Sequence, residues 1–147
     1  LFPYTTLFRS MRDFGDDSLT TEGRALRDAL MVATSANEPL TQAIRAAGVN
    51  QADAVMAKVW QLKSPKRNWR QTEDVVSLLE ISKIFPDLGA KAAALLAQAP
   101  IKEVGPGLVP LLYEQTWARP VLDQWHVSGD ASRPVKQAIE QARKGAR

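Results

Sequence analysis

The sequence predicts an all-α fold, a multi-helix bundle of about seven short helices forming one domain over residues 18–147. Apolar residues recur at helical spacing along most of the chain, and Pro and Gly divide these stretches into short segments. No segment alternates apolar and polar residues for long enough to demand a strand. Hydrophobic residues make up 45% of the chain, an ordinary share for a globular protein.

The first helix is expected to start near Ser18–Thr21 and to run to about Ala33. Hydroxyl groups at its start can accept hydrogen bonds from the free N–H groups of the first turn. Asn37 and Pro39 predict the start of a second helix over 40–47.

A glycine is expected to end the second helix, because Gly48 stands where a left-handed backbone is favoured. Asn50 then predicts the cap of a third helix over 51–62. The apolar residues of this third helix recur at helical spacing and should face the core: Ala52, Val55, Met56, Val59 and Trp60.

The segment Leu40–Val55 resembles the helix-turn-helix of DNA-binding domains, in which two short helices meet at a glycine. The resemblance implies that the second helix enters a DNA groove. That helix carries Lys58 as its only base, and Asp53 would face phosphate. We therefore interpret the segment as a plain pair of helices and keep DNA reading as the alternative.

The most buried helix is expected to begin at a cap by Thr72, with two acidic residues that complement the helix dipole. Apolar side chains cover much of its circumference, which indicates burial on most sides. We expect the centre of the core at this helix, with Trp60 against it or close by. The apolar residues are Val75, Leu78, Leu79, Ile81, Ile84 and Phe85.

Four further helices are predicted in the second half of the chain, over 88–99, 108–115, 117–126 and 135–144. Pro120 fits because it falls in the first turn of its helix. The first of the four carries a run of alanines that permits close packing: Ala92, Ala93, Ala94 and Ala97.

The stretch from residue 72 to 144 can be interpreted as stacked antiparallel helix pairs. Within it, the segment GLVPLL at Gly107–Leu112 resembles a helix of a HEAT-type repeat. That resemblance implies a short stack of helical hairpins. A repeat array should show a self-similar period, and none is evident in the sequence. An irregular bundle and a HEAT-like stack are therefore both open.

The first ten residues, Leu1 to Ser10, resemble a translated sequencing adapter. LFPYTTLFRS is the in-frame translation of CTC TTT CCC TAC ACG ACG CTC TTC CGA TCT, which is similar to the end of a common short-read adapter. We expect this segment to be non-native and without a structural role. We also expect residues 11–17 to form a loose lead-in, and residues 11–147 to be a fragment of a longer protein.

Composition excludes several classes of protein. Of the 19 Lys and Arg residues only Arg9 lies in the adapter-like segment, so residues 11–147 carry a net charge of +2. Dedicated nucleic-acid binders usually carry a larger imbalance. The chain has no cysteine, which excludes disulfides and thiolate chemistry and is compatible with a cytoplasmic location. No apolar run is long enough to span a membrane.

One basic segment, residues 58–70, has the chain's strongest charge asymmetry. Cations beside aromatic rings suit single-stranded nucleic acid, which offers phosphates and base faces. A solvated loop, or a loop that contacts an acidic partner, is the simpler interpretation. The candidate contacts are Lys58, Lys63, Lys66, Arg67, Trp69 and Arg70, while Trp60 shares the spacing of the core residues.

Catalysis and cofactor or metal binding are not expected from these residues. His126 is the only histidine, and Asp123 and Ser128 supply the other residue types of a catalytic triad. His126 and Ser128 are two positions apart, however, and residues at that spacing do not share a helical face. Gly105–Gly107 lacks the following lysine of a phosphate-binding loop. One histidine without cysteine is a poor zinc ligand set.

Three aromatic residues, Tyr113, Trp117 and Trp125, are spaced so that they share one helical face if the segment is continuous. Packing inside the last hairpin is one interpretation. The other is an exposed aromatic groove for a partner helix.

The sequence thus predicts a non-catalytic helical module for protein interaction or regulation, acting on a protein partner or on other domains of the same chain. A nucleic-acid-binding domain that uses residues 58–70 is one alternative. A helical appendage of an enzyme whose catalytic part lies upstream is another.

Overall fold

The computed structural model describes residues 19–33, 35–63, 75–99 and 101–145, and seven α-helices lie within these ranges. No strand occurs in the described residues, so the predicted all-α fold is confirmed. The adapter-like segment and the lead-in lie outside the described residues. The helices are α2 (Thr21–Val32), α3 (Glu38–Lys63), α4 (Val76–Ile84), α5 (Gly89–Leu96), α6 (Val109–Tyr113), α7 (Arg119–Val127) and α8 (Arg133–Gly145).

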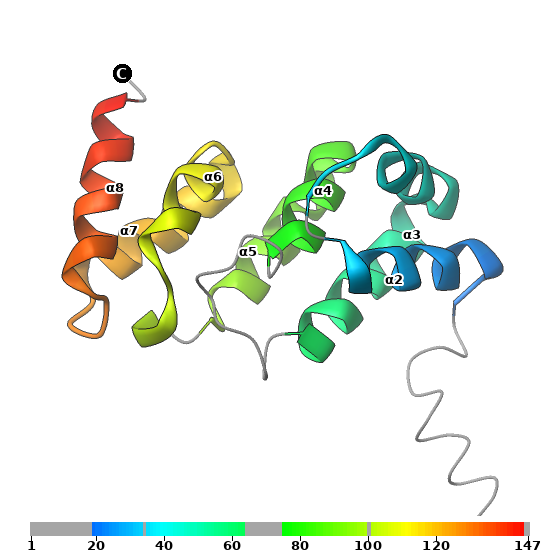
Figure 1. The fold of residues 1–147 in the computed structure, drawn as a ribbon, viewed down its shortest axis with the longest axis horizontal. Coiled ribbons are helices and arrows are strands. Elements are labelled where there is room, and N and C mark those ends of the chain that lie inside the picture. Colours follow the sequence, from blue (N-terminus) through cyan, green and yellow to red (C-terminus); the bar gives the residue numbers. More distant parts are fainter. Residues whose placement is uncertain (1–18, 34, 64–74, 100, 146–147) are drawn as a thin grey trace, which may run out of the picture.

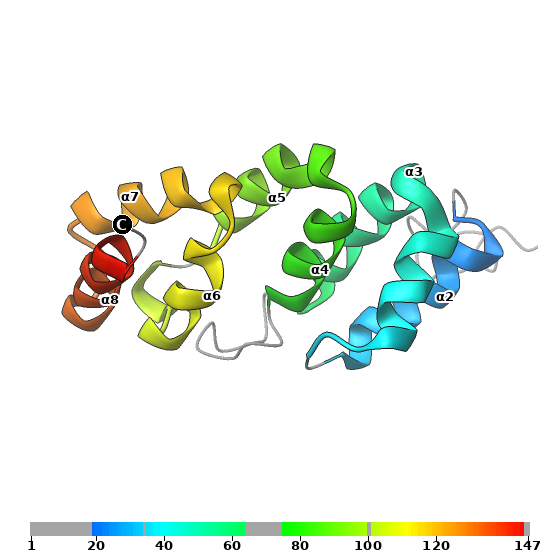
Figure 2. The same ribbon diagram turned by 90° about the horizontal axis from the view of Figure 1, so that it is seen from above.

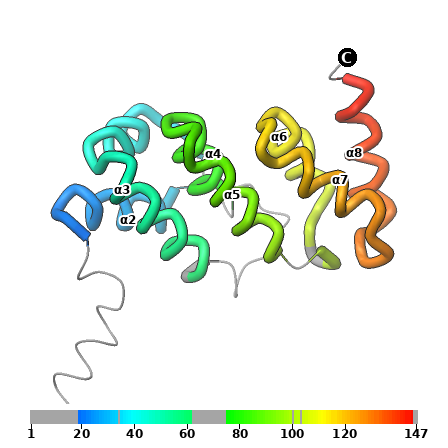
Figure 3. Tube along the Cα trace, turned by 180° about the vertical axis from the view of Figure 1, so that it is seen from behind, coloured from blue at the N-terminus to red at the C-terminus, as the bar shows by residue number. Residues whose placement is uncertain are grey.

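The helices are laid side by side along the long axis of the molecule, from α2 at one end to α8 at the other (Figures 1 and 3). Seen from above, α5 and α7 follow one edge, while α4, α6 and α8 follow the other (Figure 2). Helices α2 and α3 form the remaining end. Short 3₁₀ turns link the helices of the second half: η3 (Pro86–Leu88), η4 (Ile101–Glu103), η5 (Pro106–Leu108) and η6 (Thr116–Ala118).

The hairpin formed by α4 and α5 is repeated in the backbone 30 residues later. The turn η3 corresponds to η6, and α5 begins at Gly89 as α7 begins at Arg119. The buried positions recur with the same offset: Leu78 and Leu108, Leu79 and Val109, Ser82 and Leu112, Leu88 and Ala118, Ala92 and Leu122, Leu95 and Trp125. The second half of the chain therefore contains one structural hairpin twice, a period that the sequence reading did not detect.

The helix starts in the first half are largely those that the sequence predicts. The Thr20 hydroxyl accepts a hydrogen bond from Gly23 N at 3.1 Å, and Asn37 Oδ1 accepts one from Leu40 N at 2.9 Å. These bonds satisfy N–H groups that have no partner within the helix.

The predicted second and third helices lie within α3, which consists of two helices that meet at a kink at Gly48, so the predicted break at this glycine is confirmed. Gly48 has a φ of 83°, a backbone conformation that glycine readily adopts. The third helix starts directly after Gly48, and Asn50, the predicted cap, already lies within it.

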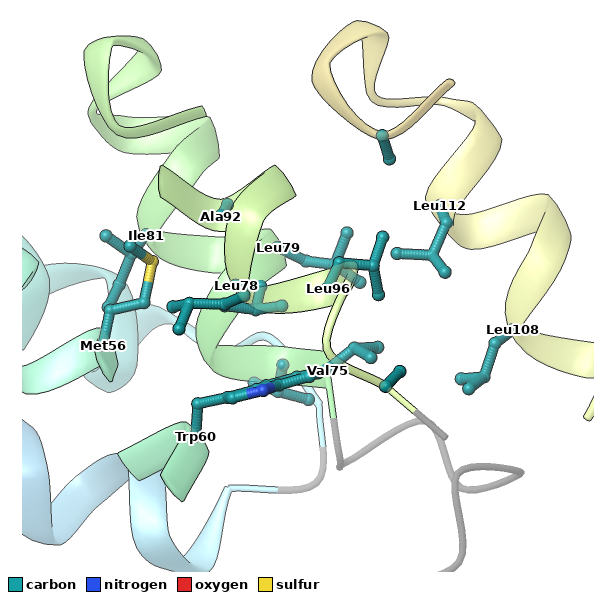
Figure 4. Close-up of a cluster of buried hydrophobic side chains, with 14 of the residues drawn as sticks. Met56, Trp60, Val75, Leu78, Leu79, Ile81, Ala92, Leu96, Leu108 and Leu112 are labelled. Atoms are coloured by element: carbon teal, nitrogen blue, oxygen red, sulfur yellow. The ribbon is translucent and has the colours of Figure 1, made fainter. Parts of the chain in front are cut away.

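The core lies where the sequence places it, around α4. Met56 lies beside Ile81, the ring of Trp60 lies beside Val75, and Leu96 points toward α6 (Figure 4). Trp60 is only 2% exposed, and Leu78 and Ile81 are fully buried.

Two expectations about the core are corrected. Phe85 is half-buried, because it follows the last turn of α4 at the edge of the core. Among the alanines of α5 only Ala92 is fully buried, while Ala94 and Ala97 face solvent. The predicted cap at Thr72 lies outside the described residues.

Candidate functional site

Only part of the basic segment, residues 58–70, lies within the described residues. Trp60 is buried in the core, so its ring offers no face to a nucleic-acid base. Lys58 is half-buried on α3, and Lys63 is the last residue of that helix. The remaining candidates lie outside the described residues, and their role stays a prediction: Lys66, Arg67, Trp69 and Arg70.

The segment that resembles a helix-turn-helix is packed against other helices. Asp53 Oδ1 lies 2.7 Å from Lys91 Nζ of α5, and Gln51 Oε1 accepts a hydrogen bond from Thr20 N at 2.7 Å. A Cβ at Gly23 would collide with the terminal amide of Gln51, so a side chain there would require this amide to move. These contacts tie the supposed recognition helix to α2 and α5.

The three aromatic residues do not form one exposed face. Trp125 is 2% exposed and belongs to the core. Trp117 is half-buried against α5, where a Cβ on Gly89 would lie 3.1 Å from the Trp117 Cβ. Tyr113 is half-buried beneath Arg119, whose guanidinium carbon lies 4.8 Å from the ring centroid and whose Nε donates to Tyr113 O at 2.9 Å. The three side chains therefore pack against neighbouring helices and turns and do not line an exposed groove.

The lone histidine takes part in a cross-helix contact. His126 Nε2 lies 3.0 Å from Glu140 Oε1 on α8, and this hydrogen bond lowers the pKa of Glu140, with a further contribution from neighbouring cations. Asp123 pairs with Arg143 Nη2 at 2.6 Å, and the Ser128 hydroxyl accepts a hydrogen bond from Asp130 N. The three residues of the supposed triad thus have separate partners.

A small apolar hollow lies between the end of α5, η4 and the part of α7 from Pro120 to Trp125. Its volume is about 270 Å³ and its lining carries no charged side chain. Gln124 is the one polar residue among those that line it. The lining residues are Ala97, Ile101, Pro120, Val121, Gln124 and Trp125.

The outward face of α7 continues this uncharged surface. Pro120, Gln124 and Val127 are exposed and spaced so that they lie on one side of the helix. Val127 is 74% exposed. The equivalent exposed residues of α5 are Ala90, Ala94 and Ala97. We call these six residues and the hollow the α5–α7 face.

The terminal helix has a different character. Apart from Pro134 and Gly145, the exposed positions of α8 are polar or charged: Arg133, Gln137, Glu140, Gln141 and Lys144. The six residues of the α5–α7 face carry no charge, while Lys91 of α5 and Asp123 of α7 are exposed beside them. Single exposed apolar residues are ordinary on protein surfaces, whereas a continuous apolar patch next to a hollow marks an interaction site.

The sequence reading missed this face because the hollow brings together three elements that are separate in the chain. A local signal was present, since three exposed residues of α7, Pro120, Gln124 and Val127, repeat at helical spacing and carry no charge. Within the described ranges no three His, Cys, Asp or Glu residues are grouped as metal ligands, and no helix has the length and apolarity to cross a bilayer.

Comparisons with protein-family models, with curated proteins and with solved structures give no match for this chain.

Proposed function

We propose that this chain is a helical protein-interaction module that receives an apolar side chain of a partner protein on the α5–α7 face. The observation that carries the proposal is the uncharged hollow beside the exposed face of α7. The partner is a separate protein or another domain of a longer chain. For the present chain, we propose the architecture of a helical hairpin stack of the HEAT type.

The size and lining of the hollow favour a side chain over a small molecule. Small-molecule sites enclose roughly 300–1,000 Å³ and hold several polar groups that orient the ligand. The hollow has about 270 Å³ and one amide, that of Gln124. One bulky apolar side chain fits such a space, and the amide can donate to or accept from the partner's backbone.

An amphipathic helix is the expected form of the partner. Such helices insert apolar residues into grooves between helices and keep their charged face in water. The small side chains of Ala90 and Ala94 allow a helix to approach α5 closely, while the larger residue at the anchor position occupies the hollow.

The test uses a displayed library of amphipathic helical peptides selected on the whole chain, with affinities then measured by fluorescence anisotropy. Ala97→Glu places a charge at the rim of the hollow and should weaken binding by about tenfold or more, because the charge would be buried without a partner. Ala25→Glu is the matched control, since Ala25 is an exposed alanine of α2. Peptides that bind the Ala97→Glu variant as well as the original chain would refute the proposal.

Nucleic-acid binding is the competing outcome. A labelled single-stranded oligonucleotide is titrated at low and high salt. The interaction-module proposal predicts no saturable binding, whereas binding that weakens steeply with salt would replace it with the function expected from residues 58–70.

A further inference from the structure

We propose that two ion pairs at the borders of the α5–α7 face neutralise the exposed charged residues of α5 and α7, so that an apolar partner can cover the face. The pairs are Asp53 with Lys91, and Asp123 with Arg143. Asp53 and Arg143 lie on other helices and are therefore positioning residues for partner binding. This inference rests on the proposed function and adds how the charge beside that site is controlled.

The two ion pairs lie on opposite sides of the face. Helices α5 and α7 lie between α3 and α8 (Figure 3). On the α3 side, Lys91 Nζ lies 2.7 Å from Asp53 Oδ1. On the α8 side, Arg143 Nη2 donates a hydrogen bond to Asp123 Oδ1 at 2.6 Å.

Both charged residues are next in sequence to a residue of the face. Lys91 follows Ala90, and Asp123 precedes Gln124. Consecutive residues point roughly 100° apart around a helix, so each charge lies at the edge of the face. The side chains of Lys91 and Asp123 are 45% and 54% exposed, and a partner on the face would take water from both.

Pairing lowers the cost of that lost water. A single charge that loses its water raises the free energy of the complex. The attraction of a nearby opposite charge offsets part of this cost. Loss of Arg143 would therefore leave an uncompensated negative charge at the edge of the face, and loss of Asp53 would leave a positive one.

Charged nitroxide probes test the neutralisation without a partner. A cationic and an anionic probe are added separately to the isotope-labelled chain at low salt, and the relaxation enhancement of each backbone amide is measured. Arg143→Gln should raise the ratio of cationic to anionic enhancement at Gln124 about twofold. Asp53→Asn should lower the same ratio at Ala90. Arg133→Gln, which removes an exposed cation of α8 that has no ion pair with any described residue, is the control and should leave the ratio at Gln124 near its original value.

Peptide affinity tests the consequence for binding. The probe is a helical peptide selected on the whole chain, whose binding is weakened by Ala97→Glu. Arg143→Gln should raise its dissociation constant about three- to fivefold. Arg143→Lys, which keeps the charge, should restore most of the affinity, and so should the double variant with Asp123→Asn, because no single charge remains. An exposed ion pair contributes little to stability, so circular dichroism should show these variants folded.

The inference is overturned if Arg143→Gln leaves the probe ratio at Gln124 unchanged, or if the double variant binds no better than Arg143→Gln alone. Peptides that are sensitive to Ala97→Glu and bind the Arg143→Gln variant as tightly as the original chain would refute the role of the ion pairs and leave the proposed function standing. If the library yields no peptide sensitive to Ala97→Glu, the proposed function fails and this inference fails with it.

Discussion

The two hairpins of the second half, α4–α5 and α6–α7, have the same backbone plan and different surfaces. Their 3₁₀ turns and second helices begin at equivalent positions, and both bury the same six sites. Three outward positions on and just after α5 carry Ala90, Ala94 and Ala97, whereas the equivalent positions of α7 carry Pro120, Gln124 and Val127. Each helix also exposes one charged residue, Lys91 on α5 and Asp123 on α7. The buried positions thus maintain the hairpin, and the exposed positions are free to differ.

The glycine that opens α5 shows how one hairpin accommodates the other. Gly89 lies against Trp117, which belongs to the turn before α7. The equivalent residue of the second hairpin is Arg119, which is half-buried over Tyr113 and has no following hairpin turn against it within the described chain. Residues at equivalent backbone positions therefore make different contacts, according to the neighbouring element.

The largest expected effect comes from shortening the aromatic residue at a shared buried site. Trp125→Ala should lower the free energy of unfolding by about 3–5 kcal/mol, as removal of a buried aromatic ring generally does. Leu95→Ala at the equivalent site should cost about 2–4 kcal/mol, because it leaves a smaller cavity. Urea unfolding followed by circular dichroism measures both, and a larger loss for Leu95→Ala would contradict the comparison.

A smaller effect on stability is expected at the first residue of α5 and of α7, the second helices of the two hairpins. Gly89→Ala should destabilise the fold by about 1–3 kcal/mol, because the added methyl group crowds Trp117. Arg119→Ala should cost about 0.5–1.5 kcal/mol, through the lost contact with Tyr113. The same unfolding measurement applies, and a stabilising Gly89→Ala would show that the tight contact between the hairpins is absent.

The smallest effect concerns the ion pair between α7 and α8. The pKa of Glu140 is lowered from its ordinary value of 4.5 by the hydrogen bond with His126. A lowered pKa contributes stability above the ordinary value, and this contribution is lost as the pH falls through the folded-state pKa. Thermal midpoints of Glu140→Gln and the original chain should therefore differ slightly at pH 6 and converge in acid. Glu114→Gln, an exposed control directly after α6, should show no such convergence.

Local features of the fold could be predicted from the sequence, because they depend on neighbouring residues. The hydrogen bonds of the Thr20 hydroxyl and the Asn37 amide each join residues three positions apart, and the positive φ is a property of Gly48 alone. The burial of Trp60 followed from its helical spacing with Val59 and Met56.

The repeated hairpin and the hollow could not be predicted in the same way. Equivalent buried sites hold residues of different size, such as Ala92 and Leu122 or Leu95 and Trp125, so no period is visible in the residue types. Only the three-dimensional arrangement makes them equivalent. The hollow depends on contacts between α5, η4 and α7, which no local pattern specifies.

The central claim is that α7 presents the binding surface, whereas the outer face of α8 does not. Titration of the isotope-labelled chain with a helical peptide selected on it, followed by amide and methyl NMR spectra, tests it most directly. The account predicts that the signals of Gln124 and Val127 shift as peptide is added, while those of Val32 and of the exposed α8 residues stay constant. Constant Gln124 and Val127 signals, or shifts confined to α2 or α8, would contradict it.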